Sequence, residues 1–149
     1  MPDSVISDAE LTFLKELRRR KVKFLVVGMS AAVIQGVDAS TQDLDIWFKS
    51  LSDPNIDAAA RAAGGILSWR ANPPMVVGKG LDHIDIVYKC DGLKDFDSEY
   101  ARSKAAKIFA VNVRALPLER ILVSKRVANR PKDQAAIPAI EAALAIQKK

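Results

Sequence analysis

The chain has 149 residues, of which 49% are apolar, so it can bury a hydrophobic core without stabilisation by disulfides or bound metal. This length fits one domain spanning residues 1–149. Its net charge of +5 is modest, and a single cysteine, Cys90, excludes an internal disulfide. No apolar run reaches the roughly 18 residues of a membrane span, and the N-terminus lacks the basic-then-apolar order of a secretory signal. We therefore expect a soluble, cytoplasmic protein with no membrane partner.

The predicted elements alternate between helix and strand along the chain. Ser7 and Glu10 have the spacing of a helix-capping box, and apolar residues recur at helical intervals to about Arg19. Further elements follow from β-branched runs, helical periodicity and the Gly and Pro residues between them. They are a strand over 22–27, a helix over 30–35, a strand over 43–48, a helix over 54–63, strands over 66–69, 75–77 and 83–88, a short helix over 96–103, one or two strands over 107–113, a helix that opens at Pro117, and a helix over 133–147. This order predicts an α/β domain with a mixed sheet and a C-terminal helical pair.

Charge is unevenly distributed along the sequence. Residues 101–132 contain nine Lys or Arg and one acid, whereas residues 82–99 contain six acids and two bases. A site that binds metal and phosphate needs both signs of charge near each other. Solvated surface faces are the commoner explanation of such clusters, so the charge pattern alone does not assign a function.

Three aspartates on two predicted strands are the candidate metal ligands. Asp43 and Asp45 alternate on one strand, so both carboxylates face the same side, where a divalent cation would relieve their repulsion. Asp85 lies in another apolar strand, where a buried carboxylate needs a metal or a partner. If the two strands are neighbours, the three carboxylates converge on one or two Mg²⁺ ions. The Asp-x-Asp pattern alone is weak evidence, because most such pairs are turn or surface acids.

A short segment, Gly28-Met29-Ser30, lies between a predicted strand and a predicted helix. Backbone amides at such a junction form a natural cradle for phosphate, and glycine permits a close approach. An ordinary strand-to-helix turn has the same pattern, so the segment becomes informative only together with the aspartates.

Four motifs occur in a fixed order. They are Val26-Val27-Gly28-Met29-Ser30-Ala31-Ala32-Val33-Ile34-Gln35-Gly36, Thr41-Gln42-Asp43-Leu44-Asp45-Ile46, Asp85-Ile86-Val87, and a C-terminal element with Lys125 followed by Arg130-Pro131-Lys132-Asp133. This order resembles the DNA polymerase β-like nucleotidyltransferase superfamily, and most of all its small bacterial branch, which includes the abortive-infection toxin nucleotidyltransferases. The resemblance covers about residues 22–147.

The resemblance implies a metal-dependent transfer of a nucleoside monophosphate from an NTP, such as ATP, to an acceptor hydroxyl. The cofactor would be Mg²⁺ or Mn²⁺, the acceptor a protein hydroxyl, a tRNA end or a small molecule, and the chain a candidate toxin–antitoxin component. Neither the acceptor nor the oligomeric state follows from the residues. The implied roles are metal binding by Asp43 and Asp45, completion of the site and deprotonation of the hydroxyl by Asp85, phosphate binding by Gly28 and Ser30, charge neutralisation by Lys125, and orientation of that lysine by Asp133.

The sequence departs from the family pattern at three positions. Met29 stands where relatives have Gly or Ser, Ala39 where an arginine is common, and Ala136 where an aspartate is usual. None of the three removes a metal ligand. Two other functions remain open: a catalytically silent interaction module with this fold, and a small basic nucleic-acid-binding domain whose affinity would fall steeply with salt.

The remaining polar and aromatic candidates are weaker. His83 alternates with Asp85 and could reach the site, although a histidine at a strand edge is usually structural. Cys90 has no neighbouring base in the sequence and is interpreted as inert. Trp47 and Trp69 could stack on a base, although core packing is the commoner role of aromatic residues in strands.

Overall fold

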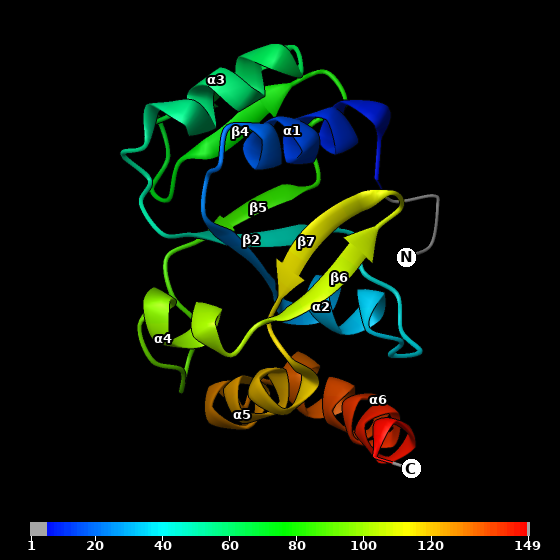
Figure 1. Cartoon of the computed structure of the whole chain (residues 1–149). Helices are drawn as coiled ribbons and strands as arrows, with labels where there is room; N and C mark the ends of the chain where they lie inside the picture. Colours follow the sequence, from blue (N-terminus) through cyan, green and yellow to red (C-terminus); the bar gives the residue numbers. More distant parts are fainter. Residues whose placement is uncertain (1–5, 149) are drawn as a thin grey trace.

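The computed structural model describes residues 6–148, so residues 1–5 and 149 of the predicted domain lie outside the description. Helices and strands follow the expected order (Figure 1). The helices are α1 (Asp8–Arg19), α2 (Gly28–Ile34), α3 (Pro54–Ala62), α4 (Phe96–Ala101), α5 (Leu118–Ala128) and α6 (Pro131–Gln147). The strands are β1 (Phe24–Val27), β2 (Leu44–Phe48), β3 (Gly65–Ser68), β4 (Met75–Gly78), β5 (Ile84–Val87), β6 (Lys104–Ile108) and β7 (Val111–Ala115). None of the helices within residues 6–148 is long and apolar enough to cross a membrane.

Five strands form one mixed sheet in the order β5-β2-β1-β7-β6, and β3 pairs with β4 in a separate two-stranded sheet. Strand β2 lies antiparallel to β1 and parallel to β5, and β1 lies parallel to β7. The residues of β1 are all buried, because helices cover both faces of the central strand. This topology places the start of β2 beside the start of β5.

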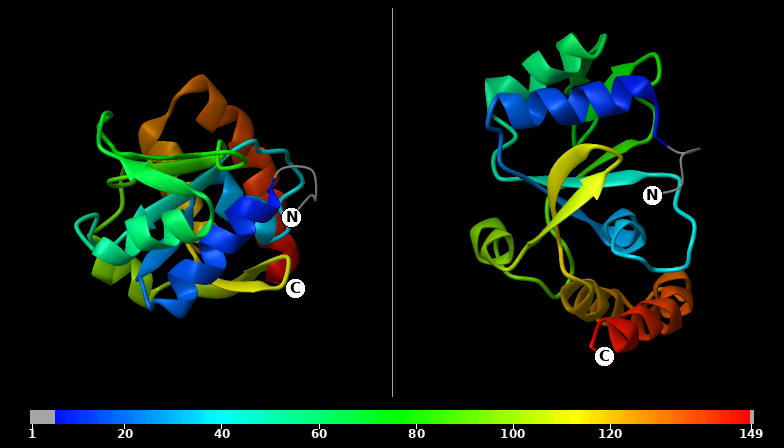
Figure 2. Two further views of the ribbon diagram at one scale, coloured as in Figure 1. Left: turned by 90° about the horizontal axis from the view of Figure 1, so that it is seen from above. Right: turned by 45° about the vertical axis from the view of Figure 1, so that its right-hand side comes forward.

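Helices lie on both sides of the five-stranded sheet. In Figure 1, α1 and α3 lie above the sheet together with the β3–β4 pair, and α2, α5 and α6 lie below it. The right-hand view of Figure 2 shows α5 and α6 side by side at the end of the molecule opposite α1 and α3. From α1, the side chains of Phe13, Leu14 and Leu17 are fully buried in the core. The predicted capping box of α1 is present, with Ser7 and Glu10 each accepting a hydrogen bond from the other's backbone amide.

Three local features differ from the sequence-based expectation. Helix α2 begins at Gly28 itself, so Gly28-Met29-Ser30 is the first turn of the helix rather than a loop before it. The segment predicted as one or two strands over 107–113 is a longer antiparallel hairpin, β6–β7, which turns at Phe109 with a φ of 52°. Pro131 begins α6, because a proline is well tolerated at the first helical position, where its missing N–H has no partner to lose.

Candidate active site

Asp45 and Asp85 lie opposite each other on the parallel strands β2 and β5. The strand neighbours predicted from the sequence are therefore neighbours in the sheet, and the two carboxyl groups are close enough to share a hydrogen bond. Asp45 is partly buried, whereas Asp85 is exposed. The strand register thus fixes a pair of acids at the edge of the sheet.

The pair has an unusual protonation equilibrium. Burial, followed by the charge and hydrogen bond of Asp85 and the charge of Asp43, raises the pKa of Asp45 to about 7, and the nearby Lys125 only partly opposes this shift. Two carboxylates at this distance cannot both ionise cheaply. In the absence of a cation, the pair therefore retains a proton in the pH range in which isolated aspartates are charged.

This shift predicts that the metal-free protein loses stability as the pH rises from about 4 to about 7. In that interval the unfolded chain releases the Asp45 proton while the folded chain keeps it, so the folded state binds more protons and its stability falls with pH. The loss should be on the order of 2 to 4 kcal/mol, since one pKa unit corresponds to about 1.4 kcal/mol. Thermal unfolding at several pH values in the presence of a chelator measures this dependence. Asp45→Asn should flatten the curve in this interval, and an equally steep curve in that variant would assign the dependence to other groups.

Gly28 packs directly against the Asp45 carboxyl group. A Cβ atom placed on Gly28 would lie 2.5 Å from Oδ2 of Asp45, well inside van der Waals contact. The φ angle of Gly28 is also +62°, a conformation that favours glycine. The glycine predicted to allow close approach is therefore required by the structure, and the group that approaches it is the candidate metal ligand itself.

The Ser30 side chain is fully buried and does not line the cavity. Its hydroxyl donates a hydrogen bond of 2.8 Å to the Val27 carbonyl and accepts one of 3.0 Å from the Asp45 amide. This arrangement differs from the expectation that the Ser30 hydroxyl binds phosphate. The hydroxyl instead ties the first turn of α2 to the backbone of β2 at Asp45, which positions that carboxylate.

Lys125 and Asp133 form an ion pair between α5 and α6. The Lys125 ammonium lies 3.0 Å from Oδ1 of Asp133, with 14% of the lysine side chain exposed and none of the aspartate. Arg130 also binds Asp133 through Nε at 2.7 Å. Although burial acts to raise it, the hydrogen bonds from Arg130 and Lys125 hold the pKa of Asp133 well below its usual range. Asp133 therefore stays ionised and fixes the lysine, which is the arrangement that the sequence predicts for these two residues.

These groups surround a cavity of about 320 Å³ between the sheet and the C-terminal helices. Its wall is formed by Gly28, residues of β2 and β5, and residues of α5 and α6. The volume is at the lower end of the range for small-molecule sites. Its charged lining residues are Asp45, Asp85, Asp91, Asp133, Lys89, Lys125, Arg130 and Lys132. Residues from the acidic middle and the basic C-terminal third of the chain therefore meet here with four charges of each sign.

Asp43 does not complete the predicted group of three carboxylates. The last pair of the β2–β5 ladder at this end joins Leu44 to Ile84, so Asp43 lies outside it and is exposed. Among the residues described, no three or more His, Cys, Asp and Glu side chains are arranged to hold a metal ion. The structure brings two of the three acids together, while the charge of Asp43 still raises the pKa of Asp45.

The weaker candidates lie in different environments. The backbone amide and ring nitrogen Nδ1 of His83 lie 2.7 and 3.3 Å from the carboxylate oxygens of the buried Glu10, so this histidine anchors the start of β5 to α1. Burial, with the charges of nearby acids, raises the pKa of the Cys90 thiol to about 12, so it stays protonated as expected for an inert cysteine. Trp47 is buried, and Trp69 is 60% exposed.

Sequence reasoning did not single out Lys89, Asp91, Arg130 or Lys132, which also line the cavity. Arg130 and Lys132 belong to the C-terminal motif, so their position in that motif was the signal that could have identified them. Lys89 and Asp91 follow β5 in a loop whose path the strand pattern does not specify. Met29, Ala39 and Ala136, the three residues at which the sequence departs from the expected pattern, are partly buried and pack against the hydrophobic core.

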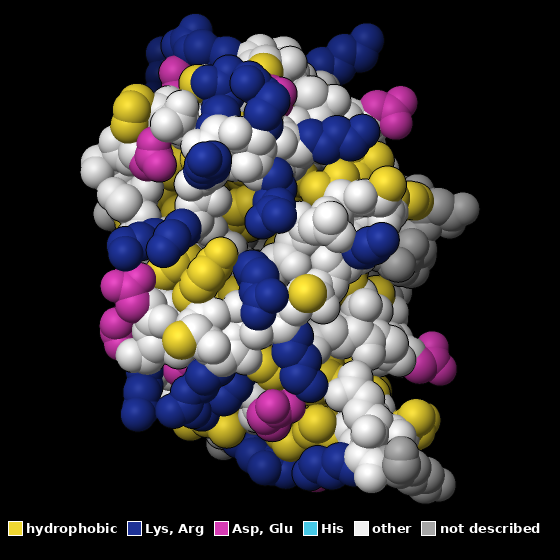
Figure 3. Space-filling model, viewed as in Figure 1, with side chains coloured by type: hydrophobic (Ala, Val, Ile, Leu, Met, Phe, Trp, Pro, Cys, Tyr) yellow, Lys and Arg dark blue, Asp and Glu magenta, His cyan; other side chains and the backbone are white. Residues whose placement is uncertain are grey.

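On the face shown in Figure 3, Lys and Arg side chains are scattered across the middle among uncharged atoms, and most Asp and Glu side chains lie toward the edges. The charged cavity is the better-defined feature of the molecule, because both signs of charge converge there on a concave surface.

Comparisons with known proteins address the fold. No family model matches the chain, and no curated protein matches it. Among solved structures, the chain is similar to the aminoglycoside nucleotidyltransferase ANT(2″)-Ia, whose structure is a complex with adenylyl-2″-tobramycin. The TM-score is 0.61 at 15% sequence identity, over 93% of this chain and 88% of that chain. The chain therefore has the α/β nucleotidyltransferase fold, with a mixed five-stranded sheet and a C-terminal helical pair.

Proposed function

We propose that the chain is a nucleotidyltransferase that transfers a nucleoside monophosphate from an NTP to an acceptor hydroxyl, with release of pyrophosphate. The observation that supports this most is the meeting of the Asp45–Asp85 pair and the Lys125–Asp133 pair in one cavity. Phosphoryl transfer requires this combination, because acids bind the metal while a cation balances phosphate charge. The similar solved structure holds an adenylylated acceptor, which fits the same reaction class.

The acid pair fits a divalent cation. Asp45 and Asp85 lie opposite each other, and burial with the charge of Asp85 raises the pKa of Asp45, as expected for two acids whose negative charge is poorly compensated. Carboxylate oxygens are the preferred ligands of Mg²⁺ and Mn²⁺. We propose that Asp45 and Asp85 bind the ion, with Asp43, whose charge acts on Asp45, as a further carboxylate near the pair. A bound divalent cation supplies positive charge to the phosphate oxygens.

The residues of the chain have separate roles in the proposed reaction. Lys125, held by Asp133, binds and neutralises the phosphates of the donor, and Gly28 leaves room for the Asp45 carboxyl group at the start of α2. Asp85, the more exposed acid, accepts the proton of the acceptor hydroxyl. The hydroxyl oxygen forms a bond to the α-phosphorus, the bond from that phosphorus to the bridging oxygen breaks, and pyrophosphate leaves with the electron pair.

The direct test is incubation of the protein with each labelled NTP, Mg²⁺ or Mn²⁺ and a cell lysate or metabolite extract. Label transferred to any acceptor, with release of pyrophosphate, supports the proposal. NTP binding without transfer to any acceptor would favour a catalytically silent module. Binding of nucleic acid that persists without metal and falls steeply with salt would favour the nucleic-acid-binding alternative.

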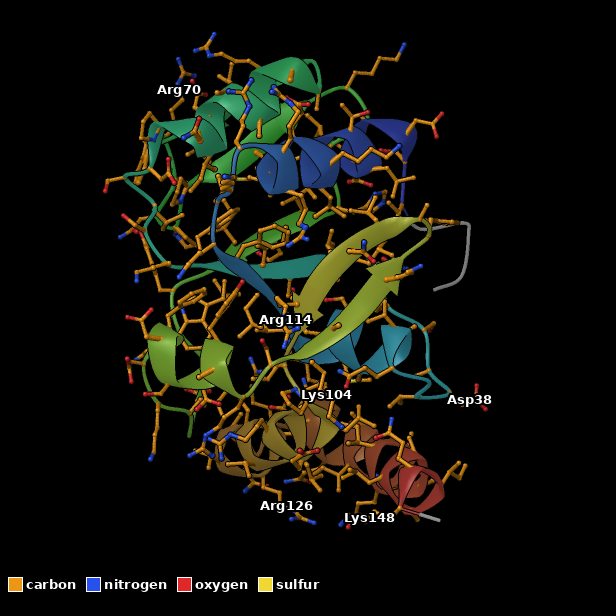
Figure 4. The ribbon with its side chains drawn as sticks, viewed as in Figure 1. Asp38, Arg70, Lys104, Arg114, Arg126 and Lys148 are labelled. Atoms are coloured by element: carbon orange, nitrogen blue, oxygen red, sulfur yellow. The ribbon has the colours of Figure 1, made fainter. Side chains whose placement is uncertain are left out.

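Replacement of Lys125 tests whether the C-terminal helices belong to the donor site. Lys125→Ala should weaken NTP binding by about 1.5 to 3 kcal/mol, the range of a charge-assisted hydrogen bond. Arg126 is the matched control, because it lies on the outer surface of α5, points away from the sheet (Figure 4) and pairs with Glu141 at 3.0 Å. Arg126→Ala should change the affinity little. Calorimetric titration measures both values, and an equal or larger loss at Arg126 would remove Lys125 from the site.

A further inference from the structure

A second cavity of about 590 Å³ opens beside the candidate active site. The two cavities share three lining residues, Val87, Lys89 and Cys90. The second cavity extends from β2 and β5 to the segment that leads into α4. A molecule placed in it would therefore lie next to the Asp45–Asp85 pair without occupying the position proposed for the donor phosphates.

Strand geometry places both cavities on the same face of the sheet. Trp47 is two residues from Asp45 on β2, and Val87 is two residues from Asp85 on β5, so each pair of side chains projects to one face. Trp47 and Phe96 are buried and pack edge to face with ring centroids 5.6 Å apart. They give the second cavity a rigid apolar floor that begins beside the two acids.

The rim of the second cavity is positively charged. Three lysines, Lys49, Lys89 and Lys94, line it, together with one acid, Asp95. The Lys49 ammonium lies 3.1 Å from a carboxylate oxygen of Asp97. Within residues 6–148, neither Lys89 nor Lys94 has a carboxylate within 4.0 Å of its ammonium group.

The acid at the rim keeps its negative charge, because the hydrogen bond from the Ser98 hydroxyl and, to a smaller extent, the charge of Lys94 lower the pKa of Asp95. Asp95 accepts a hydrogen bond of 2.6 Å from the Ser98 hydroxyl. Glu99, behind the rim, is fully buried and bound by Arg120 at 2.7 Å. With Lys49 paired to Asp97, Lys89 and Lys94 still outnumber the one carboxylate of the lining, Asp95, so the rim favours an anionic ligand over a cationic one.

We propose that the second cavity binds the acceptor, and that the acceptor is an anion that carries an apolar ring near its hydroxyl group. This inference rests on the proposed nucleotidyl transfer and names its substrate class. The acceptor's phosphate or carboxylate pairs with Lys94 and Lys89, its ring lies on Trp47, and its hydroxyl reaches Asp85. The transfer step is the one described above: the proton passes to Asp85, the hydroxyl oxygen bonds to the α-phosphorus, and pyrophosphate leaves.

The acceptor of the similar solved structure has the opposite charge. Tobramycin, as an aminoglycoside, carries amino groups that are protonated near neutral pH, and its adenylylated form is bound there. Here, the lysine rim would repel such a polycation at the position where the acceptor must enter. The two proteins thus share a fold while the charge of this rim selects a different acceptor class.

The test uses four aromatic probes of similar size: phenyl phosphate, benzoate, benzyl alcohol and benzylamine. Each is titrated into the full-length protein with Mg²⁺ and a non-hydrolysable ATP analogue at saturating concentration, and the quenching of tryptophan fluorescence is followed. Phenyl phosphate or benzoate should bind at least about tenfold more tightly than benzylamine. The ranking of phenyl phosphate against benzoate then distinguishes a phosphate-bearing acceptor from a carboxylate-bearing one.

Lys94 is the informative position, because it lines the second cavity and not the first. Lys94→Gln should weaken anion binding about tenfold and leave the affinity for the ATP analogue unchanged. Lys104→Gln is the matched control, since Lys104 is exposed on the β6–β7 hairpin (Figure 4) and lines neither cavity. This control should change anion binding less than twofold.

The outcomes separate this inference from the proposed function. Benzylamine binding as tightly as phenyl phosphate, or unchanged anion affinity in Lys94→Gln, overturns the anionic acceptor while ATP binding remains intact. Failure of the wild-type protein to bind a non-hydrolysable analogue of any of the four NTPs with Mg²⁺ overturns the nucleotidyl transfer, and the acceptor role with it. Anion preference that depends on Lys94, in a protein that also binds the analogue, supports both.

Discussion

Asp45→Asn should abolish metal-dependent nucleotide transfer while the protein stays folded. The substitution keeps the size of the side chain but removes the negative charge that the cation requires. Asp45 is the less exposed member of the acid pair. Transfer should fall by about a hundredfold or more, because a group that stabilises charge in a transition state contributes roughly 3 to 4 kcal/mol. Asp85→Asn should have a comparable effect, since it removes both a ligand and the proposed base. Pyrophosphate release in the presence of labelled NTP and the acceptor source measures the loss.

The control for this experiment is Asp82→Asn. Asp82 is exposed, precedes β5 and does not line the cavity, so its replacement should leave transfer close to the wild-type rate. NTP affinity without metal provides a second readout. This affinity should stay close to the wild-type value in Asp45→Asn, because the metal-free acid pair already carries a proton and Lys125 remains. Full transfer activity in Asp45→Asn would remove the acid pair from the mechanism.

The sequence was sufficient to predict the element order and the neighbouring positions of Asp45 and Asp85. Alternation on a strand decides the face on which each carboxylate lies, and apolar neighbours on both strands indicate that both are buried, while the pairing of the two strands is seen in the structure. The same reasoning could not predict that Asp43 lies outside the strand pairing. Strand ends depend on which backbone groups find partners, and here the ladder between β2 and β5 stops at Leu44.

The sequence also did not predict the hydrogen bonds of the Ser30 hydroxyl or the second cavity. A serine after a glycine suggests a phosphate contact, but its hydroxyl is satisfied by two backbone groups, one of which belongs to a strand that begins 14 residues later. Lys94 and Trp47 meet at the second cavity through tertiary packing of the α4 segment on the sheet. No local pattern specifies a contact between segments so far apart, whereas local periodicity does specify the strands themselves.

Gly28→Ala should cause the largest loss of function among substitutions that do not change charge. The new methyl group would lie 2.5 Å from Oδ2 of Asp45, so either the carboxyl group or the start of α2 must move. Positive φ adds strain of about 1 kcal/mol or more for a residue with a Cβ atom. Because the displaced group is a proposed metal ligand, and misplacement by about 1 Å can cost roughly a hundredfold in rate, transfer should fall by about that factor.

Gly36→Ala separates the steric effect from backbone strain. Gly36 also has a positive φ, +99°, but a Cβ atom there would have no neighbour within 4 Å. Its replacement should therefore lower the melting temperature and leave Mg²⁺-dependent NTP binding near the wild-type value, whereas Gly28→Ala should weaken both. In the double variant Gly28→Ala/Asp45→Ala, removal of the carboxyl group relieves the clash. The double variant should therefore lose less free energy of unfolding than the sum of the losses in the two single variants. Strictly additive stability changes, or equal losses of NTP binding at Gly28 and Gly36, would show that contact with Asp45 is not what keeps position 28 a glycine.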